Sequence, residues 1–80
     1  MTGMEPPYTQ CVDTSGLRCP EPVMMLHNAL RKLAVGDILK VIATDPTTER
    51  DIPRFCHYLG HELVKESAEQ GVYLYFIRRG

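Results

Sequence analysis

This sequence of 80 residues has little of several features that would define a function at once. Nine Lys and Arg residues face ten Asp and Glu residues, so the net charge is −1 and the basic excess of a duplex-binding protein is missing. No apolar stretch approaches the length of a membrane span, and none near the N-terminus is typical of a secretory signal. We therefore expect one cytoplasmic domain that binds neither a membrane nor nucleic acid directly.

The cysteines are also few, at positions 11, 19 and 56. Three cysteines do not form an even disulfide set, so we expect free thiols in a reducing compartment. Their spacing matches neither a zinc pattern nor the Cys-x-x-Cys of redox proteins, and we expect no metal and no cofactor. Cys56 lies on the apolar face of a predicted helix and is expected in the core. Cys11 is either a packed strand residue or a resolving partner for Cys19.

The most distinctive stretch is Leu17-Arg18-Cys19-Pro20-Glu21-Pro22, which combines a turn, a thiol and the start of a helix. Proline is tolerated in a first helical turn but not in a helix interior. The two prolines therefore predict a helix that begins at about Pro20, with Cys19 at or next to its N-cap. Because the positive end of a helix lowers the pKa of a nearby thiol, we expect Cys19 to be a reactive nucleophile.

Apolar periodicity predicts the remaining elements. Asp51 is expected to cap the second helix, because an earlier start would place Pro53 in the helix interior. Residues 68–71 are expected to form a four-residue hairpin loop. The expected strands are 8–13, 37–44, 61–67 and 72–78, the expected helices are 20–33 and 52–59, residues 1–7 are expected to be a disordered lead-in, and 8–80 form the single domain.

This β-α-β-α-β-β order predicts an α/β (α+β) two-layer sandwich with a four-stranded mixed sheet. Right-handed crossovers place both helices on one face of the sheet. The last strand follows a tight hairpin and runs antiparallel to the third. The second and fourth strands are the most apolar and suit the centre, which predicts the order 1-2-4-3. The other face is expected to be largely wet and to show either Tyr73 and Tyr75 or Ile38 and Ile42.

Residues 16–23, Gly-Leu-Arg-Cys-Pro-Glu-Pro-Val, resemble the signature of the TusA/SirA family of sulfur carrier proteins, and most closely its TusA branch. The resemblance continues through Asp45-Pro46 and Arg-Asp-Ile-Pro at 50–53, and covers about residues 12–80. It implies that Cys19 accepts sulfane sulfur, as a persulfide, from a PLP-dependent cysteine desulfurase. A downstream relay protein then takes the sulfur, and the relay ends in 2-thiolation of the wobble uridine of certain tRNAs.

The resemblance also implies a relay carrier with sulfurtransferase-type chemistry rather than a stand-alone enzyme, and we expect a monomer. Pro20 and Pro22 are expected to hold the helix cap in shape. Arg18 either adds positive charge beside Cys19 or is simply solvated. Glu21 suits the helix dipole, although its charge opposes thiolate formation, and it could instead contact a partner.

Three residues beyond the motif belong to the same family pattern: Asp45, Arg50 and Asp51. We interpret them first as cap and turn residues and second as an edge for docking a partner. Two other function classes stay open. One is a non-catalytic protein-binding or regulatory module that uses the exposed sheet face, and the other is a thiol redox protein that pairs Cys19 with Cys11.

Overall fold

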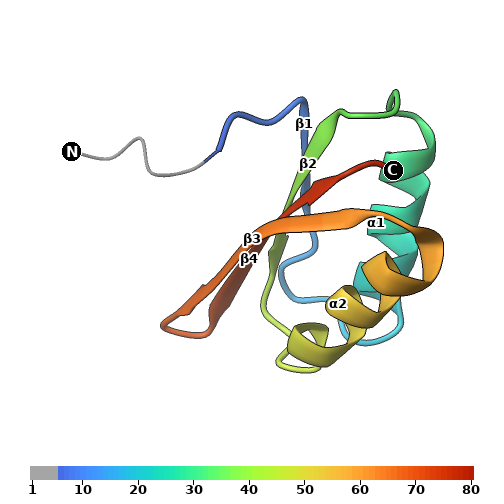
Figure 1. Ribbon diagram of the computed structural model, residues 1–80. Helices are drawn as coiled ribbons and strands as arrows, with labels where there is room; N and C mark the ends of the chain where they lie inside the picture. Colours follow the sequence, from blue (N-terminus) through green and yellow to red (C-terminus); the bar gives the residue numbers. More distant parts are fainter. Residues whose placement is uncertain (1–5) are drawn as a thin grey trace.

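The computed structural model describes residues 6–80 and has the expected β-α-β-α-β-β order (Figure 1). Its four strands form one mixed sheet in the order β1-β2-β4-β3, and both helices lie on the same side of it, so the predicted fold is confirmed. Most of the lead-in expected over residues 1–7 lies outside the described residues. The elements are β1 (Gln10–Asp13), α1 (Glu21–Arg31), β2 (Ile38–Ala43), α2 (Thr48–Leu59), β3 (Glu62–Glu69) and β4 (Val72–Arg78).

Strand β2 organises the sheet, because it pairs in parallel with β1 and antiparallel with β4. Successive side chains of a strand point to opposite faces. Leu39, Val41 and Ala43 are fully buried, and they alternate with residues that are only partly covered. The face that carries these three residues is therefore the one covered by the helices.

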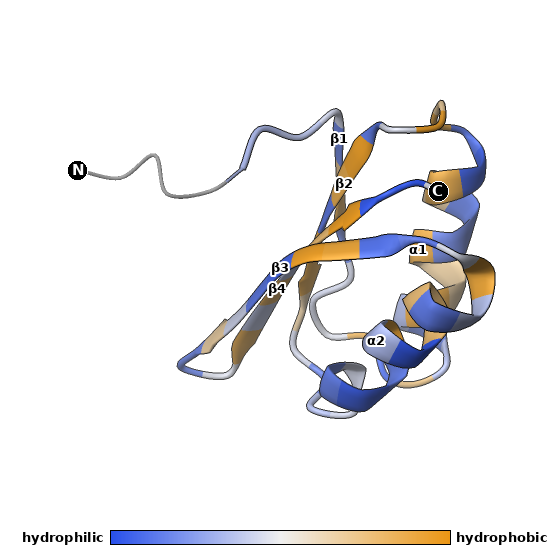
Figure 2. Ribbon diagram, in the orientation of Figure 1, coloured by the Kyte–Doolittle hydropathy of each residue, from blue (hydrophilic) through white to orange (hydrophobic). Residues whose placement is uncertain are grey.

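The core lies between this sheet face and the two helices. Figure 2 shows hydrophobic residues concentrated along β2 and β4, whereas the start of α2 is hydrophilic. In α1, Leu26 and Leu30 lie one turn apart and are buried, as are Ile52 and Cys56 in α2. Spacing of four residues places each pair on one helix face. Neither these helices nor any other helix within residues 6–80 is long and apolar enough to cross a membrane.

The expectation that Tyr73 and Tyr75 show on the open face of the sheet is wrong. Tyr75 is only 1% exposed and belongs to the helix-covered core, against which Tyr73 also packs. Tyr73 and Tyr75 therefore do not lie on the open face of the sheet. Phe76, which points the other way, is also 1% exposed, because the Tyr8 ring (centroids 6.3 Å apart) and the Lys40 ammonium (5.8 Å from the ring centroid) cover it.

Helix α2 begins one turn earlier than the sequence predicted. Thr47 is the N-cap, Thr48 is the first helical residue, and Pro53 lies inside the helix. The prediction that Asp51 is the N-cap is therefore wrong. A proline in a helix interior lacks one backbone hydrogen bond and clashes with the preceding turn, so other contacts must stabilise this early start.

Those contacts centre on Thr48, which is buried at the sheet. Its hydroxyl donates to the Asp45 carbonyl (2.7 Å) and lies 2.8 Å from the Tyr75 hydroxyl. The Asp45 carboxylate accepts a hydrogen bond from the Thr47 backbone N–H (3.0 Å) and so takes the capping role. These tertiary bonds offset the cost of Pro53, and nothing in the local helix pattern indicates them.

The hairpin between β3 and β4 is tighter than expected. Strand β3 continues to Glu69, so the turn contains only Gln70 and Gly71 rather than four residues. Their φ angles are 53° and 80°, and two consecutive positive values are typical of a type I′ turn. Glycine adopts such a conformation without strain, whereas Gln70 does so at some cost.

The C-terminal residues contact the segments that follow both helices. The Gly80 N–H donates to Nδ1 of His61 (3.0 Å), and the Arg79 guanidinium donates to the Leu33 carbonyl. Burial lowers the pKa of His61, and the charges of Arg79 and His27 lower it further. A neutral imidazole is required here, because Nδ1 accepts only when it carries no proton.

We expect Thr48→Val to lower the free energy of unfolding by about 1–3 kcal/mol, because the buried Tyr75 hydroxyl and Asp45 carbonyl each lose a partner. Tyr75→Phe should cost less, since Thr48 still donates to Asp45. Urea denaturation of both variants measures the difference. Equal losses would contradict the central role of the Thr48 hydroxyl.

We also expect acid to destabilise the fold through His61. Because its folded pKa is lowered, its contribution is fully present above about pH 6.5, the ordinary value for an unfolded histidine, and is lost as pH falls through the folded pKa. His61→Asn keeps an acceptor near the Nδ1 position and should flatten this part of the pH–stability curve. His57→Asn, at an exposed position, is the matched control, and equal curves for the two variants would contradict the role of His61.

Candidate functional site at Cys19

The loop that carries Cys19 is tied to the end of β2. Buried Thr14 donates through its hydroxyl to the Ile42 carbonyl (2.7 Å), and the Gly16 N–H donates to the Thr44 hydroxyl (2.9 Å). Gly16 has a φ of 82°, which favours glycine. Because β1 and β2 are parallel, the loops that follow them emerge at the same edge of the sheet. The sequence around residue 19 is thereby brought to the sequence around residue 45.

The motif prolines form the start of α1, as expected. Pro20 is the N-cap and follows a cis peptide bond, Glu21 is the first helical residue, and Pro22 is buried in the first turn. Cys19 thus lies directly before the N-cap with an exposed side chain. The helix ends at Arg31, two residues short of the expected end.

Two carboxylates contact Cys19 from another part of the chain. The Cys19 backbone N–H donates to Oδ2 of Asp45 (2.7 Å), and its Sγ donates to Oδ2 of Asp51 (3.3 Å). The other oxygen of Asp51 accepts from Nε of Arg50 (3.1 Å). The β2–α2 loop therefore supplies an acceptor for the Cys19 backbone N–H, and the first turn of α2 supplies one for its thiol.

These contacts raise the pKa of the Cys19 thiol above its ordinary value. The hydrogen bond to Asp51 is the largest cause, followed by burial and by the charges of Asp51 and Asp45, while Arg50 acts in the opposite direction. A carboxylate beside a thiol disfavours the thiolate, because both groups would then be negative. The pKa of the Cys19 thiol is therefore raised in the free chain, whereas the position before a helix predicted that it is lowered.

The helix end fails to offset the carboxylates because it presents few donors. Pro20 and Pro22 have no N–H, and the Glu21 N–H donates to the Arg18 carbonyl (2.9 Å). The partial charge of a helix terminus also competes here with two full charges. The prolines that mark the motif therefore also weaken its anion-binding capacity.

The other predicted site residues divide into two groups. Arg18 and Glu21 are exposed beside Cys19, and Arg50 is exposed on α2. Asp45 is a structural centre whose pKa is lowered by the Thr47 and Cys19 N–H groups and, more weakly, by Arg18. The sequence did not predict the contact between Cys19 and Asp51, because the expected N-cap placed Asp51 before the helix rather than within its first turn.

The remaining cysteines lie in different surroundings. Cys56 is 3% exposed, and burial, with a smaller effect from Glu66, raises its pKa to about 11. Cys11 is exposed and, opposite Lys40 in the sheet register, faces the open side. Cys19 instead lies at the start of a helix that covers the other side. All three cysteines are free.

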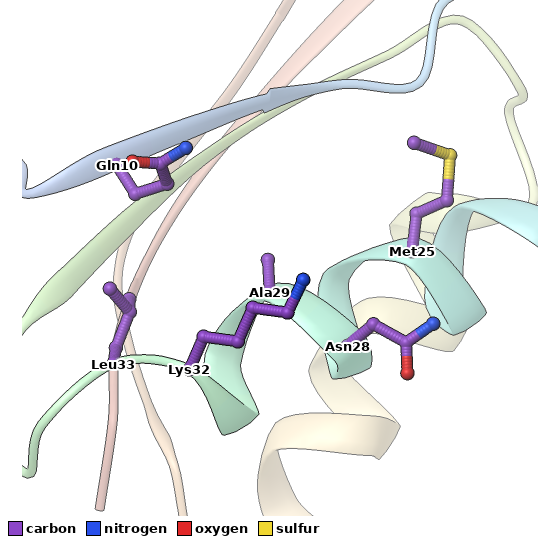
Figure 3. A pocket seen from close by; sticks show the side chains of 6 residues that line it. All are labelled: Gln10, Met25, Asn28, Ala29, Lys32 and Leu33. Carbon is purple, nitrogen blue, oxygen red and sulfur yellow. The ribbon is translucent and has the colours of Figure 1, made fainter.

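A groove of about 430 Å³ lies along α1, away from Cys19. Figure 3 shows side chains of α1 directed toward Gln10 on the edge strand β1. None of the residues placed at the candidate site lines this groove. Its lining consists of Gln10, Met25, Asn28, Ala29, Lys32 and Leu33.

We expect iodoacetamide at pH 8 to modify Cys11 and Cys19 of the native protein but not Cys56. Cys56 is buried, and with a pKa of about 11 only about one thiol in a thousand is ionised at that pH. Peptide mapping by mass spectrometry identifies the labelled residues, and the unfolded chain, labelled at all three, is the control. Rapid labelling of native Cys56 would contradict this arrangement.

Comparison with known proteins is consistent with this geometry. The sulfur carrier protein TusA of Pseudomonas paraeruginosa is 62% identical over 76 residues, which cover 95% of this chain and 96% of that protein. The protein of the same name from Pseudomonas aeruginosa is 66% identical over 68 residues, or 85% of this chain and 86% of that one.

A solved structure supports the fold alone. The SirA-like protein from Desulfitobacterium hafniense superposes with a TM-score of 0.79 at 22% identity, over 90% of this chain and 99% of that chain. A family model described as sulfurtransferase TusA matches residues 10–79, nearly the whole described structure. The extent of that match, together with the two similar relatives, shows that the chain belongs to the TusA family.

Proposed function

We propose that this chain carries sulfane sulfur as a persulfide on Cys19. It takes the sulfur from a cysteine desulfurase and passes it to a downstream relay protein. The observation that carries the proposal is the exposed Cys19 thiol before helix α1, within the motif of a family whose members are named sulfur carriers.

The chemistry consists of two thiol exchanges without an external oxidant. The Cys19 thiolate attacks the outer sulfur of the donor persulfide, the donor S–S bond breaks, and the donor cysteine leaves as a thiolate. Cys19 then holds the terminal sulfur as Cys19–S–SH. An acceptor thiolate attacks this outer sulfur in turn, and Cys19 leaves with the electron pair of the broken bond.

The destination of the sulfur follows from the family resemblance. We infer that the relay ends in 2-thiouridine at the wobble position of tRNA, in the cytoplasm. The carrier itself binds proteins rather than RNA, because its net charge of −1 lacks the basic excess of a typical nucleic-acid-binding domain. PLP belongs to the donor enzyme and not to this chain.

Exposed charges around Cys19 suit brief contacts with two different partners. Arg18 and Glu21 lie within two residues of Cys19 in the chain, and Arg50 pairs with the Asp51 carboxylate that accepts from its thiol. We infer that donor and acceptor both dock over this edge, since the outer sulfur must reach a cysteine of each. Rim charges of this kind mainly speed association and select partners.

The two other function classes have less support. A module that binds through the open sheet face would lack the tyrosines, because Tyr75 is in the core and Phe76 is covered by Tyr8. A redox pair of Cys19 with Cys11 would need both thiols on the same side of the sheet. A disulfide requires Cα atoms less than about 7 Å apart.

Incubation with an active cysteine desulfurase, PLP and cysteine is expected to add one sulfur atom to the chain. Intact-mass spectrometry should show the gain, a reductant should remove it, and Cys19→Ser should abolish it. Cys11→Ser is the matched control, because it removes an exposed thiol outside the motif. Loading that persists in Cys19→Ser, or depends on Cys11, would overturn the proposal.

A further inference from the structure

We propose that Asp51 is a positioning residue that favours the unloaded thiol of Cys19 and thereby drives sulfur from this carrier toward its acceptor. The proposal rests on the persulfide function inferred above, and it assigns to Asp51 the direction of sulfur transfer. It begins from the contact of Sγ with Oδ2 of Asp51 at 3.3 Å.

The Asp51 carboxylate is held in place for this contact. It lies in the first turn of α2, and its other oxygen accepts from Nε of Arg50 at 3.1 Å. Asp45 fixes the cysteine backbone through the bond of its Oδ2 to the Cys19 N–H. The thiol therefore meets an acceptor that is oriented before any partner binds.

This contact distinguishes the empty carrier from the loaded one. A thiol has a proton to donate to Asp51, whereas the Sγ of a persulfide is bonded to sulfur and has none. The outer S–H of a persulfide is more acidic than a thiol, so the loaded group is anionic near neutral pH. The carboxylates of Asp51 and Asp45 then repel the anionic persulfide, whereas they tolerate the neutral thiol of the unloaded carrier.

The release step restores the favourable contact. An acceptor thiolate bonds to the outer sulfur, the Cys19 S–S bond breaks, and the electron pair remains on Sγ. Sγ takes a proton from water and again donates to Asp51. The difference in interaction between the two states lowers the affinity of Cys19 for sulfur and raises its tendency to give it up.

The charges that face Cys19 come from three segments. Asp51 and Arg50 lie on α2, Asp45 lies on the β2–α2 loop, and Arg18 and Glu21 flank the thiol itself. Arg50 reduces the effect of Asp51 without cancelling it, since the net effect on the pKa of the Cys19 thiol is a rise.

The first test measures the thiol without any sulfur, and so is independent of the loading experiment. In a Cys11→Ser background, the pH dependence of alkylation by iodoacetamide reports the pKa of Cys19. Asp51→Asn should lower that pKa. The ionised fraction of the thiol near neutral pH then rises about tenfold for each unit of decrease, and the alkylation rate rises with it by a smaller factor, because a less basic thiolate is a weaker nucleophile. Asp51→Glu should keep much of the effect. Glu49→Gln removes the same charge from an exposed position on α2 and should leave the profile unchanged.

The second test measures direction. Each variant is equilibrated with glutathione and glutathione persulfide, and intact mass gives the loaded fraction of Cys19. Asp51→Asn should retain more sulfur than both the parent chain and Glu49→Gln. Equal loaded fractions, or an unchanged alkylation profile in Asp51→Asn, would overturn the proposal even if the desulfurase loads Cys19 normally.

The proposal can be tested even if Asp51→Asn does not fold. If Asp51→Asn is unfolded, the parent chain is compared with itself in native buffer and in denaturant. A native Cys19 pKa above the denatured value is expected from the carboxylates beside the thiol, and a native value at or below it overturns the proposal.

Discussion

The side chain of Asp45 joins the parts of the molecule on which the site depends. One carboxylate oxygen accepts from the Cys19 N–H and the other from the Thr47 N–H, while the backbone carbonyl accepts from the buried Thr48 hydroxyl. The loop before α1, the end of β2 and the start of α2 are therefore fixed to each other at one residue. Removal of this side chain would release both the cysteine backbone and the cap of a helix.

Much of the architecture could be predicted from the sequence, because β2 and β4 are apolar enough to require the centre of the sheet. The errors arose where tertiary contacts outweigh local rules. Pro53 argues for a late start of α2, but the bonds of buried Thr48 stabilise an earlier one. The sequence predicts that side chains alternate along β4, but the register with β2 decides whether Tyr75 faces the helices or the open side.

Two cysteines show raised pKa values for different physical reasons. Cys56 is excluded from water, and its pKa of about 11 follows mainly from burial. Cys19 is exposed, and its pKa is raised first by the Asp51 hydrogen bond, so its protonation depends on charges that a docked protein can rearrange. The first thiol is inert because reagents cannot reach it. The second is restrained while the carrier is alone, which suits a group that must react only with chosen partners.

The covering of Phe76 by Tyr8 has a consequence for where this domain ends. The family model begins at residue 10, whereas the ring that covers the open sheet face comes from residue 8. At the other end the match stops at residue 79, and the Gly80 N–H still bonds to His61. A chain shortened to the matched residues would expose an aromatic ring on the open face of the sheet and loosen its last strand, and both changes favour self-association. The unit that folds is thus longer than the segment that the family model matches.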